Sequence, residues 1–175
     1  MRNQKGFTLI ELIIVIVVLG ILAVTAAPQF INFSSDARVS TVEGAKGSVK
    51  GAMDSIYARS LVDGSSGEAS ATVNTNGGEV SIVYGYPVAA AGGIDIAAGL
   101  DASDWTLVEG SSSGSTTATS ATPAAGSVGI YPSSLEASDI DFTQTDEGDT
   151  SCHLLYTEAT GESTKATVTS VTGGC

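Results

Sequence analysis

The chain has few of the residue types on which catalysis and metal binding usually depend. Its 175 residues include a single histidine, His153, and only seven lysines and arginines against 19 acidic residues. No glycine loop of the kind that cradles phosphate and no zinc-ligand spacing is present. The net charge of −12 argues against nucleic acid as a partner, because phosphate contacts require a cationic surface. We therefore expect a protein that is not an enzyme, holds no cofactor and binds no nucleic acid.

Acidic residues are concentrated in the later part of the chain. From residue 64 onward there are 14 of them and one basic residue, Lys165, whereas residues 7–63 are nearly neutral. Five acids form a cluster in a turn-rich stretch, where carboxylate oxygens could bind calcium. Their order does not match an EF-hand loop, so we favour a solvated acidic loop over a calcium site. The five candidates are Asp139, Asp141, Asp146, Glu147 and Asp149.

A long apolar run follows the amino terminus. Residues 12–35 carry no charge, and about 20 apolar residues are enough for a helix to cross the hydrocarbon core of a membrane. Glu11 lies at the amino end of this run, and Arg2 and Lys5 precede it. The run is too long for the apolar core of a signal peptide. We therefore expect a single membrane-spanning helix whose amino terminus is cytoplasmic, because positive charge stays inside.

Residues 5–11 read KGFTLIE, residues 20–23 read GILA, and residue 28 is proline. This segment resembles the leader and amino-terminal helix of the type IV pilin family. The resemblance covers about the first 60 residues. The continuation at residues 23–32 and 36–38 is most similar to the mannose-sensitive haemagglutinin (MSHA) group of type IVa major pilins.

The resemblance implies processing and assembly roles for named residues. Gly6 would precede the cut made by prepilin peptidase, and Phe7 would become the N-methylated first residue. Glu11 would meet the terminal amine of an adjacent subunit, because a charge in apolar surroundings needs a partner. The alternative for Glu11 is a side chain that reaches back to the membrane interface. In assembled filaments the helix would lose regularity between Gly20 and Pro28.

The sequence predicts an α+β fold in which a long helix packs against an antiparallel sheet. We expect a leader at 1–6, a membrane or filament-core half of the helix at 7–28, an amphipathic half at 29–63, and a head at 64–175. Proline at 28 predicts a kink or a melted segment. Apolar residues at three- and four-residue steps predict the buried stripe of the amphipathic half: Val42, Ala45, Val49, Ala52, Met53 and Ile56.

Short β-type runs in the head predict its strands. These runs are residues 79–84, 105–108, 128–131, 153–156 and 166–171, and the last two are expected to pair. Residues 94–100 fit a short helix or a loop, and residues 110–125 an exposed flexible loop. Cys152 and Cys175 are expected to form a disulfide, because the head of a pilin is exported.

Three glycines lie on one face of the amphipathic half. Gly44, Gly47 and Gly51 fall nearly opposite the apolar stripe, and each costs a helix about 1 kcal/mol relative to alanine. Our hypothesis is that a neighbouring subunit's stem approaches closely at this face. The alternative is a tolerated weak helix.

These features favour the major structural subunit of a type IV pilus. Such a subunit would wait in the inner membrane with its head in the periplasm. Pilus assembly machinery would then build it into an extracellular homopolymer for attachment and biofilm formation, with surface glycans as a further partner class. A type II secretion pseudopilin is the alternative within the class. A membrane-anchored enzyme or binding protein is the alternative outside it, and the apolar stripe beyond Pro28 argues against a simple tether.

Overall fold

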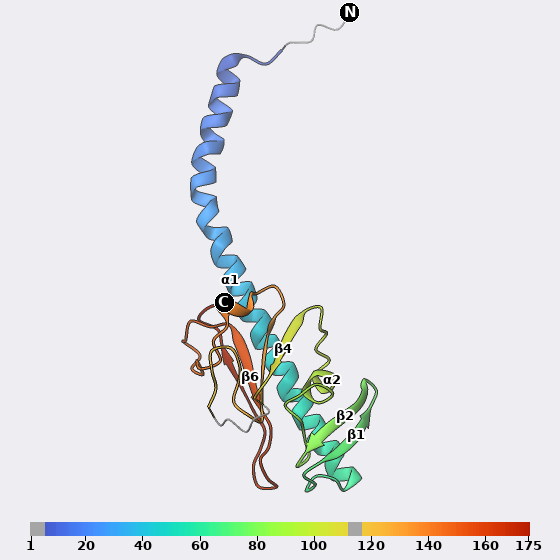
Figure 1. The fold of residues 1–175 in the computed structure, drawn as a ribbon. Coiled ribbons are helices and arrows are strands. Elements are labelled where there is room, and N and C mark those ends of the chain that lie inside the picture. Colours follow the sequence, from blue (N-terminus) through green and yellow to red (C-terminus); the bar gives the residue numbers. More distant parts are fainter. Residues whose placement is uncertain (1–5, 112–116) are drawn as a thin grey trace, which may run out of the picture. The chain divides into compact units, whose positions relative to one another are not determined.

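The computed structural model describes residues 6–111 and 117–175, except for the side chains of residues 25–32. Residues 1–5 of the expected leader and part of the expected loop at 110–125 therefore lie outside the described residues. The chain divides into two compact units, Met1–Arg38 and Val39–Cys175. The elements follow in the order α1 (Leu9–Asp63), β1 (Ala71–Thr75), β2 (Gly78–Val83), β3 (Tyr86–Pro87), α2 (Ile94–Ala98), β4 (Trp105–Glu109), β5 (Ser127–Pro132), the 3₁₀ turn η1 (Ala137–Asp139), β6 (His153–Thr157) and β7 (Thr167–Val171) (Figure 1).

The helix α1 is continuous from Leu9 to Asp63. It therefore keeps its helical backbone across Gly20 and Pro28, and the melted segment expected at this proline is absent from the single chain. The loss of regularity implied for assembled filaments stays a prediction. α1 ends where Gly64 adopts a φ of 76° and the amide of Ser65 bonds to the Ser60 carbonyl at 2.9 Å. This left-handed glycine termination agrees with the turn expected after residue 63.

The second unit contains two antiparallel sheets where the sequence predicted one. The strand order is β1-β2-β3 in the first sheet and β4-β5-β6-β7 in the second. The expected pairing of the last two strands is confirmed, with His153 opposite Val171. Strand β1 escaped prediction because its sequence, ATVNT, buries only Val73. The β2–β3 turn uses positive φ at both Tyr84 and Gly85, as a two-residue hairpin turn requires.

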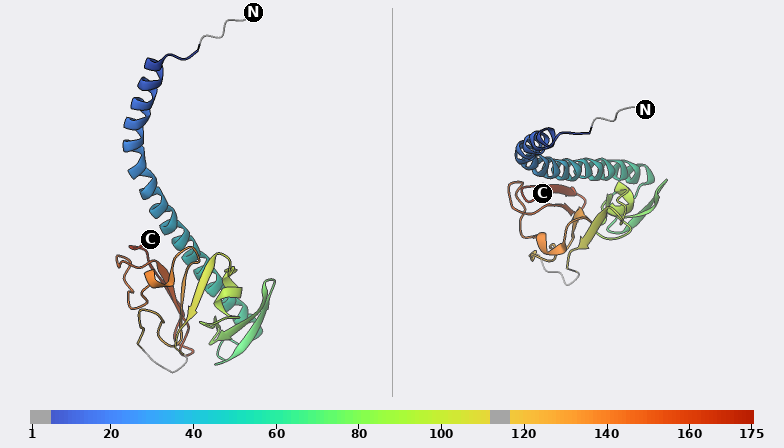
Figure 2. Two further views of the ribbon diagram at one scale, coloured as in Figure 1. Left: turned by 45° about the horizontal axis from the view of Figure 1, so that its top comes forward. Right: turned by 90° about the horizontal axis from the view of Figure 1, so that it is seen from above.

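The predicted apolar stripe of α1 is the centre of the core. All six of its members are buried, and Val42 and Val49 have no exposed surface. Val42 and Val49 pack in one cluster with residues of the four-stranded sheet such as Val128 and Leu154. Ile56 packs with the three-stranded sheet. Figure 2 shows the green hairpin and the orange-red strands lying along the teal part of α1. The α+β prediction is confirmed.

The disulfide between Cys152 and Cys175 is present, as predicted. It joins the residue before β6 to the turn that follows β7. Backbone hydrogen bonds hold the same turn, from Gly174 to the Ser151 carbonyl and from Cys175 to the Thr172 carbonyl, both at 3.0 Å. The residues 94–100 that fitted either a helix or a loop contain the short helix α2, which ends at a left-handed Gly99.

Gly129 in β5 gives a test of this packing. A Cβ atom at this position would lie 2.0 Å from Cε1 of the buried Phe142 ring. We expect Gly129→Ala to lower the free energy of unfolding by about 1–3 kcal/mol, because the ring must shift within a filled core. Urea unfolding of the full chain in detergent, followed by Trp105 fluorescence, measures the change. Gly148→Ala is the control, since a Cβ there meets no atom within 4 Å. Equal midpoints for the two variants would contradict the packing described.

Candidate functional site

The first turn of α1 is capped by a reciprocal pair of residues. Thr8 precedes the helix, and its hydroxyl accepts a hydrogen bond from the amide of Glu11 at 3.4 Å. In return, Oε2 of Glu11 accepts from the Thr8 amide at 2.8 Å and from the Thr8 hydroxyl at 2.7 Å. This arrangement is a capping box. Glu11 therefore has an intramolecular role, which the T-x-x-E spacing signals and which our sequence interpretation missed.

Gly6 and Phe7 lie in an exposed, irregular segment just before α1. Phe7 is 87% exposed, and a Cβ at Gly6 would meet no atom within 4 Å. A peptidase can reach the bond between these residues only if it is accessible and not part of a helix. The described part of the segment meets both conditions.

Apolar side chains cover every side of α1 between Leu9 and Val24. Their exposed fractions run from 45% at Ile13 to 77% at Val24. Within this stretch Gly20 is also open, with no atom near the position of a Cβ. An uncovered apolar surface of this extent indicates an interaction surface. The exposed residues include Leu9, Ile10, Leu12, Ile13, Ile14, Val15, Ile16, Val17, Val18, Leu19, Ile21, Leu22 and Val24.

A search of the described side chains finds no helix that is both long enough and apolar enough to span a membrane.

The glycine face of α1 lies where the sequence predicted it. Gly44, Gly47 and Gly51 are exposed, opposite the buried stripe, and a Cβ at any of them would meet no atom within 4 Å. The packing of the second unit therefore does not require these glycines. Close approach of another subunit stays a prediction for this face.

The acidic cluster of the described head is engaged in local hydrogen bonds. No group of three or more His, Cys, Asp or Glu side chains in the described ranges is arranged to hold a metal ion. Oδ1 of Asp141 accepts from the Thr143 hydroxyl at 2.6 Å, and Oδ2 of Asp149 accepts from the amides of Thr145 and Asp146 at 3.1 Å. The carboxylates of Asp141 and Asp149 thus bond to neighbouring turns, as in the solvated acidic loop that we favoured. Calcium binding by the weak candidates stays untested, and these are Asp139, Asp141, Asp146, Glu147 and Asp149.

His153 has a structural environment. Its Nδ1 lies 2.9 Å from the Ser151 hydroxyl, and its ring meets Phe142 edge-on with centroids 5.0 Å apart. Both His153 and Ser151 are buried, so no substrate can reach this serine–histidine pair. Nε2 of His153 has no hydrogen-bond partner among the described residues. Burial lowers the pKa of His153 to about 4.

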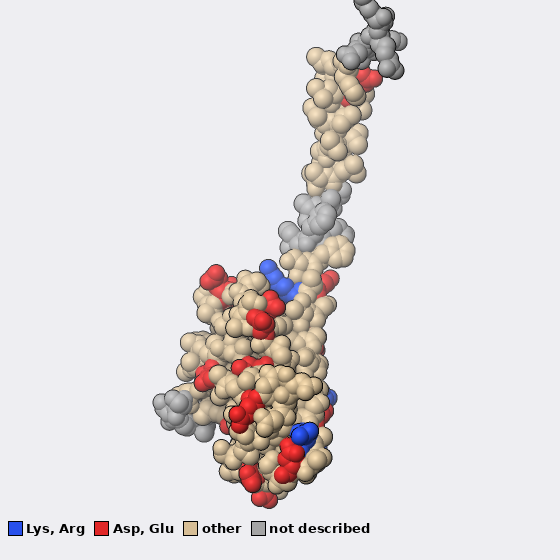
Figure 3. All heavy atoms as spheres, turned by 90° about the vertical axis from the view of Figure 1, so that its right-hand side faces the viewer, with Lys and Arg blue, Asp and Glu red and all other residues tan. Residues whose placement is uncertain are grey.

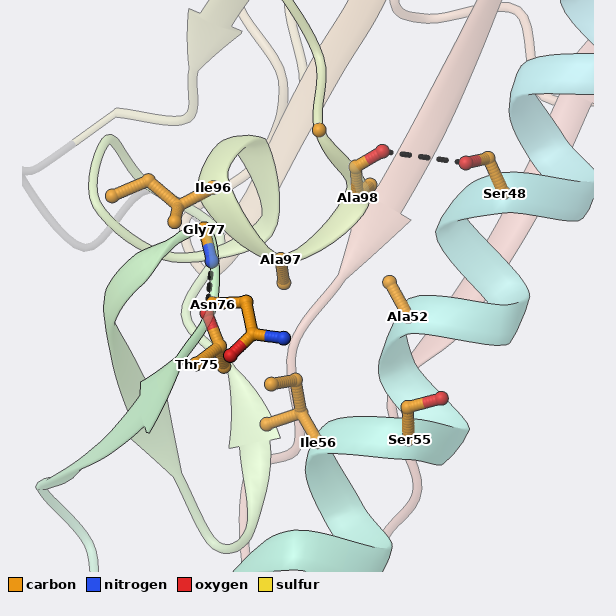
Figure 4. Close-up of a pocket in the computed structure, with 11 residues that line it drawn as sticks. Ser48, Ala52, Ser55, Ile56, Thr75, Asn76, Gly77, Ile96, Ala97 and Ala98 are labelled. Carbon is orange, nitrogen blue, oxygen red and sulfur yellow. Dashed lines mark hydrogen bonds between the residues drawn. The ribbon is translucent and has the colours of Figure 1, made fainter.

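Among the hollows of the second unit, two have clearly different linings. The larger, of about 530 Å³, is bounded by α1, the β1–β2 turn and α2, and the side chain of Asn76 points into it (Figure 4). Its lining contains no charged side chain and no thiol among the described residues. The smaller, of about 380 Å³, contains Trp105 together with Asp95 and Glu109. The larger hollow is lined by Ser48, Ala52, Ser55, Ile56, Thr75, Asn76, Gly77, Ile96, Ala97, Ala98 and Gly99.

Known proteins resemble part of the chain. The family described as the prokaryotic N-terminal methylation motif matches residues 1–27. Type IV major fimbrial protein FimA of Dichelobacter nodosus is 34% identical over 101 residues, which cover 50% of this chain and 65% of that protein. Type IV major alpha-pilin of Moraxella bovis is 46% identical over 54 residues, 31% of this chain and 34% of that protein.

A secretion protein is also similar to part of the chain. Type II secretion system core protein G of Pseudomonas aeruginosa is 42% identical over 53 residues, 30% of this chain and 37% of that protein. The chain thus spans less than two thirds of the length of these relatives. No solved structure matches it.

The burial of His153 predicts a pH-dependent stability. The pKa of His153 is about 4 in the folded chain, against an ordinary value of 6.5 that applies to the unfolded chain. Between pH 4 and pH 6.5 the unfolded chain therefore binds the proton more readily than the folded chain. The free energy of unfolding should be highest above pH 6.5 and should decline toward pH 4, by up to about 1.4 kcal/mol per pH unit. Urea unfolding from pH 4 to 7.5 measures this slope. His153→Leu lacks the titrating group, and equal slopes in the two proteins would contradict the assignment.

Proposed function

We propose that this chain, a member of the type IV pilin family by its amino-terminal segment, is a major structural subunit of a type IV pilus. The observation that carries the proposal is the helix between Leu9 and Val24. It exposes apolar side chains on all sides, and its single acid, Glu11, stands at its start. Such a surface is stable in water only when lipid or protein covers it. A polymer of the chain would supply that cover.

Processing would create the assembling form. Prepilin peptidase would cut between Gly6 and Phe7 and methylate the new amino terminus at Phe7. The methylation motif that spans residues 1–27 supports this step, as does the exposed segment before α1. The resulting amine stays positively charged near Glu11.

Residues 7–28 would then lie in the inner membrane, with the head in the periplasm, until the assembly machinery extracts the subunit. In the filament, Glu11 would face the terminal amine of an adjacent copy. The capping box satisfies hydrogen bonds of Glu11 but supplies no positive charge. A neighbouring amine would therefore still stabilise the carboxylate in apolar surroundings.

A pilus subunit is favoured over a secretion pseudopilin by the extent of similarity. The fimbrial relative aligns over 101 residues and reaches into the head, whereas the secretion relative aligns over 53. Within the pilins, residues 23–32 and 36–38 support the MSHA group of type IVa major pilins. Attachment to surfaces and biofilm formation, with surface glycans as partners, follow as the proposed roles of the assembled pilus.

Two substitutions separate the charge of Glu11 from its capping role. Glu11→Gln keeps an oxygen that can accept the Thr8 bonds but removes the charge, so we expect at least about tenfold fewer filaments with unchanged subunit in the membrane. Thr8→Ala removes the cap, at a cost of about 1 kcal/mol to the helix start, but keeps the charge. Immunoblots of sheared filaments and of membranes measure both effects. Normal filaments from Glu11→Gln, with loss in Thr8→Ala, would show that Glu11 acts only as a cap.

The mass of subunits from sheared filaments tests processing independently. We expect a chain that begins at Phe7, carries one methyl group on its amine and contains the Cys152–Cys175 disulfide. A filament subunit that retains Met1 would contradict the proposed cut. Replacing Gly6 with a bulkier residue should leave the unprocessed chain in the membrane, with the head folded as before.

A further inference from the structure

The smaller hollow of the second unit is acidic and partly aromatic. Its volume is about 380 Å³, and it is open to solvent between α2 and β4. Glu109 is fixed at its rim, because Oε1 accepts a hydrogen bond from the amide of Ala91 at 2.7 Å. Asp95 lines the same hollow, and its Oδ1 is buried without a hydrogen-bond donor among the described residues, so its charge is uncompensated there. Trp105 completes a combination of aromatic ring and carboxylates that suits a positively charged group.

No lysine or arginine lines this hollow. The deficit extends to the whole head, where Lys165 accompanies 14 acids from residue 64 onward. Figure 3 shows acidic side chains spread over the visible face of the second unit, with basic ones in few places. A cation for the hollow must therefore be Lys165, a basic residue of α1, or a group from outside the chain.

Most basic residues of α1 already have partners. Lys46 bonds to Ser170 at 2.8 Å and lies 3.5 Å from Glu43. Arg59 pairs with Asp63 at 3.1 Å. Arg38 also has an interaction partner.

Lys50 differs from these residues. It is exposed, and the described residues include no hydrogen-bond or ion-pair partner for it. Gly47 and Gly51 flank it on α1, and a Cβ at either would meet nothing within 4 Å. Asp54, one turn further along, is exposed and forms no ion pair with Lys50 in the described structure. Lys50 is thus a long cationic side chain on a face that another surface can approach closely.

We propose that the ammonium group of Lys50 binds in the Trp105 hollow of a second copy of this chain. Asp95 and Glu109 of the hollow neutralise the ammonium, and the ring of Trp105 offers it a cation–π contact. The occupant is a second copy because the charge of the hollow complements this unpaired lysine, and the flanking glycines let the two surfaces meet. The contact rests on the proposed polymerisation and adds one defined interface to it.

The geometry of such a contact has a direct consequence. Lys50 and the hollow lie at different places on one chain, so each copy still offers an unused lysine or an unused hollow after pairing. Contacts of this heterologous kind propagate into rings or open helical polymers. This contact would explain the glycine face predicted from the sequence, because larger side chains at 47 and 51 would hold the two surfaces apart.

Zero-length carbodiimide coupling of sheared filaments tests the contact. We expect amide-linked peptides that join Lys50 to Glu109 or Asp95. To show that the link is between copies, cells co-express Lys50→Gln with an Asp95→Asn/Glu109→Gln double variant. Lys50 and the intact carboxylates then reside only on different copies. The link should appear in filaments from these cells and be missing when either variant is expressed alone.

Charge exchange gives the second arm of the test. We expect Lys50→Glu to reduce filaments by about tenfold at moderate salt, because it places like charges together. Combining it with Glu109→Lys should restore most of the yield. Lys165→Gln is the matched control, because it removes the other lysine without a partner among the described residues and should leave the yield unchanged. Urea midpoints followed by Trp105 fluorescence verify that each variant remains folded.

The outcomes are distinguishable. The contact would be overturned if Lys50 in wild-type filaments were not linked to a second copy, or if Lys165 were linked instead. Either result would leave the proposed function intact. A charge-exchanged pair that stays as defective as Lys50→Glu alone would also overturn it. Absence of filaments from the wild type would overturn the proposed function and this contact with it.

Discussion

The second unit depends on the burial of one apolar stripe of α1. Val42 and Val49 are completely enclosed by the cluster that includes the four-stranded sheet, and Ile56 by the cluster with the three-stranded sheet. Both sheets therefore pack on the same helix, and Tyr86 of β3 joins the cluster of the four-stranded sheet. Because one side of α1 is used in this way, the opposite side with its glycines stays available. The division of α1 into a covered and an open side follows from the sequence period of the stripe.

The sequence could predict the features that follow from regular residue spacing or from the number of a residue type. The stripe of α1, the pairing of β6 with β7, and the disulfide all followed from spacing or from residue count. The split into two sheets did not, because β1 and β3, which pair with β2 in the first sheet, were not predicted as strands. Strand β1 was missed because it buries one valine, and the turn at Tyr84 because a non-glycine residue rarely adopts positive φ.

The site was predictable to a different degree. Motif and resemblance predicted Gly6, Phe7 and Glu11 as site residues, and considered for Glu11 either a partner on another molecule or the membrane interface. Local geometry adds the bonds to Thr8, which belong to the single chain. The acidic cluster left two interpretations open at the sequence level, and we favoured a solvated loop over a calcium site. Asp141 and Asp149 accept hydrogen bonds from neighbouring amides and hydroxyls. The sequence shows that acidic residues are close together in this loop. It does not show which carboxylate oxygens remain free, because that depends on the hydrogen-bond donors around each carboxylate.

The capping box has a kinetic consequence. Both bonds from Thr8 end on Oε2, and a carboxylate has a second oxygen and further lone pairs. Glu11 can therefore take on a new donor while it continues to hold the first turn of its own helix. A subunit that changes surroundings does not have to unravel this turn first. In the proposed transfer from membrane to filament, the activation barrier would then not include the loss of a cap, and the helix start would stay rigid.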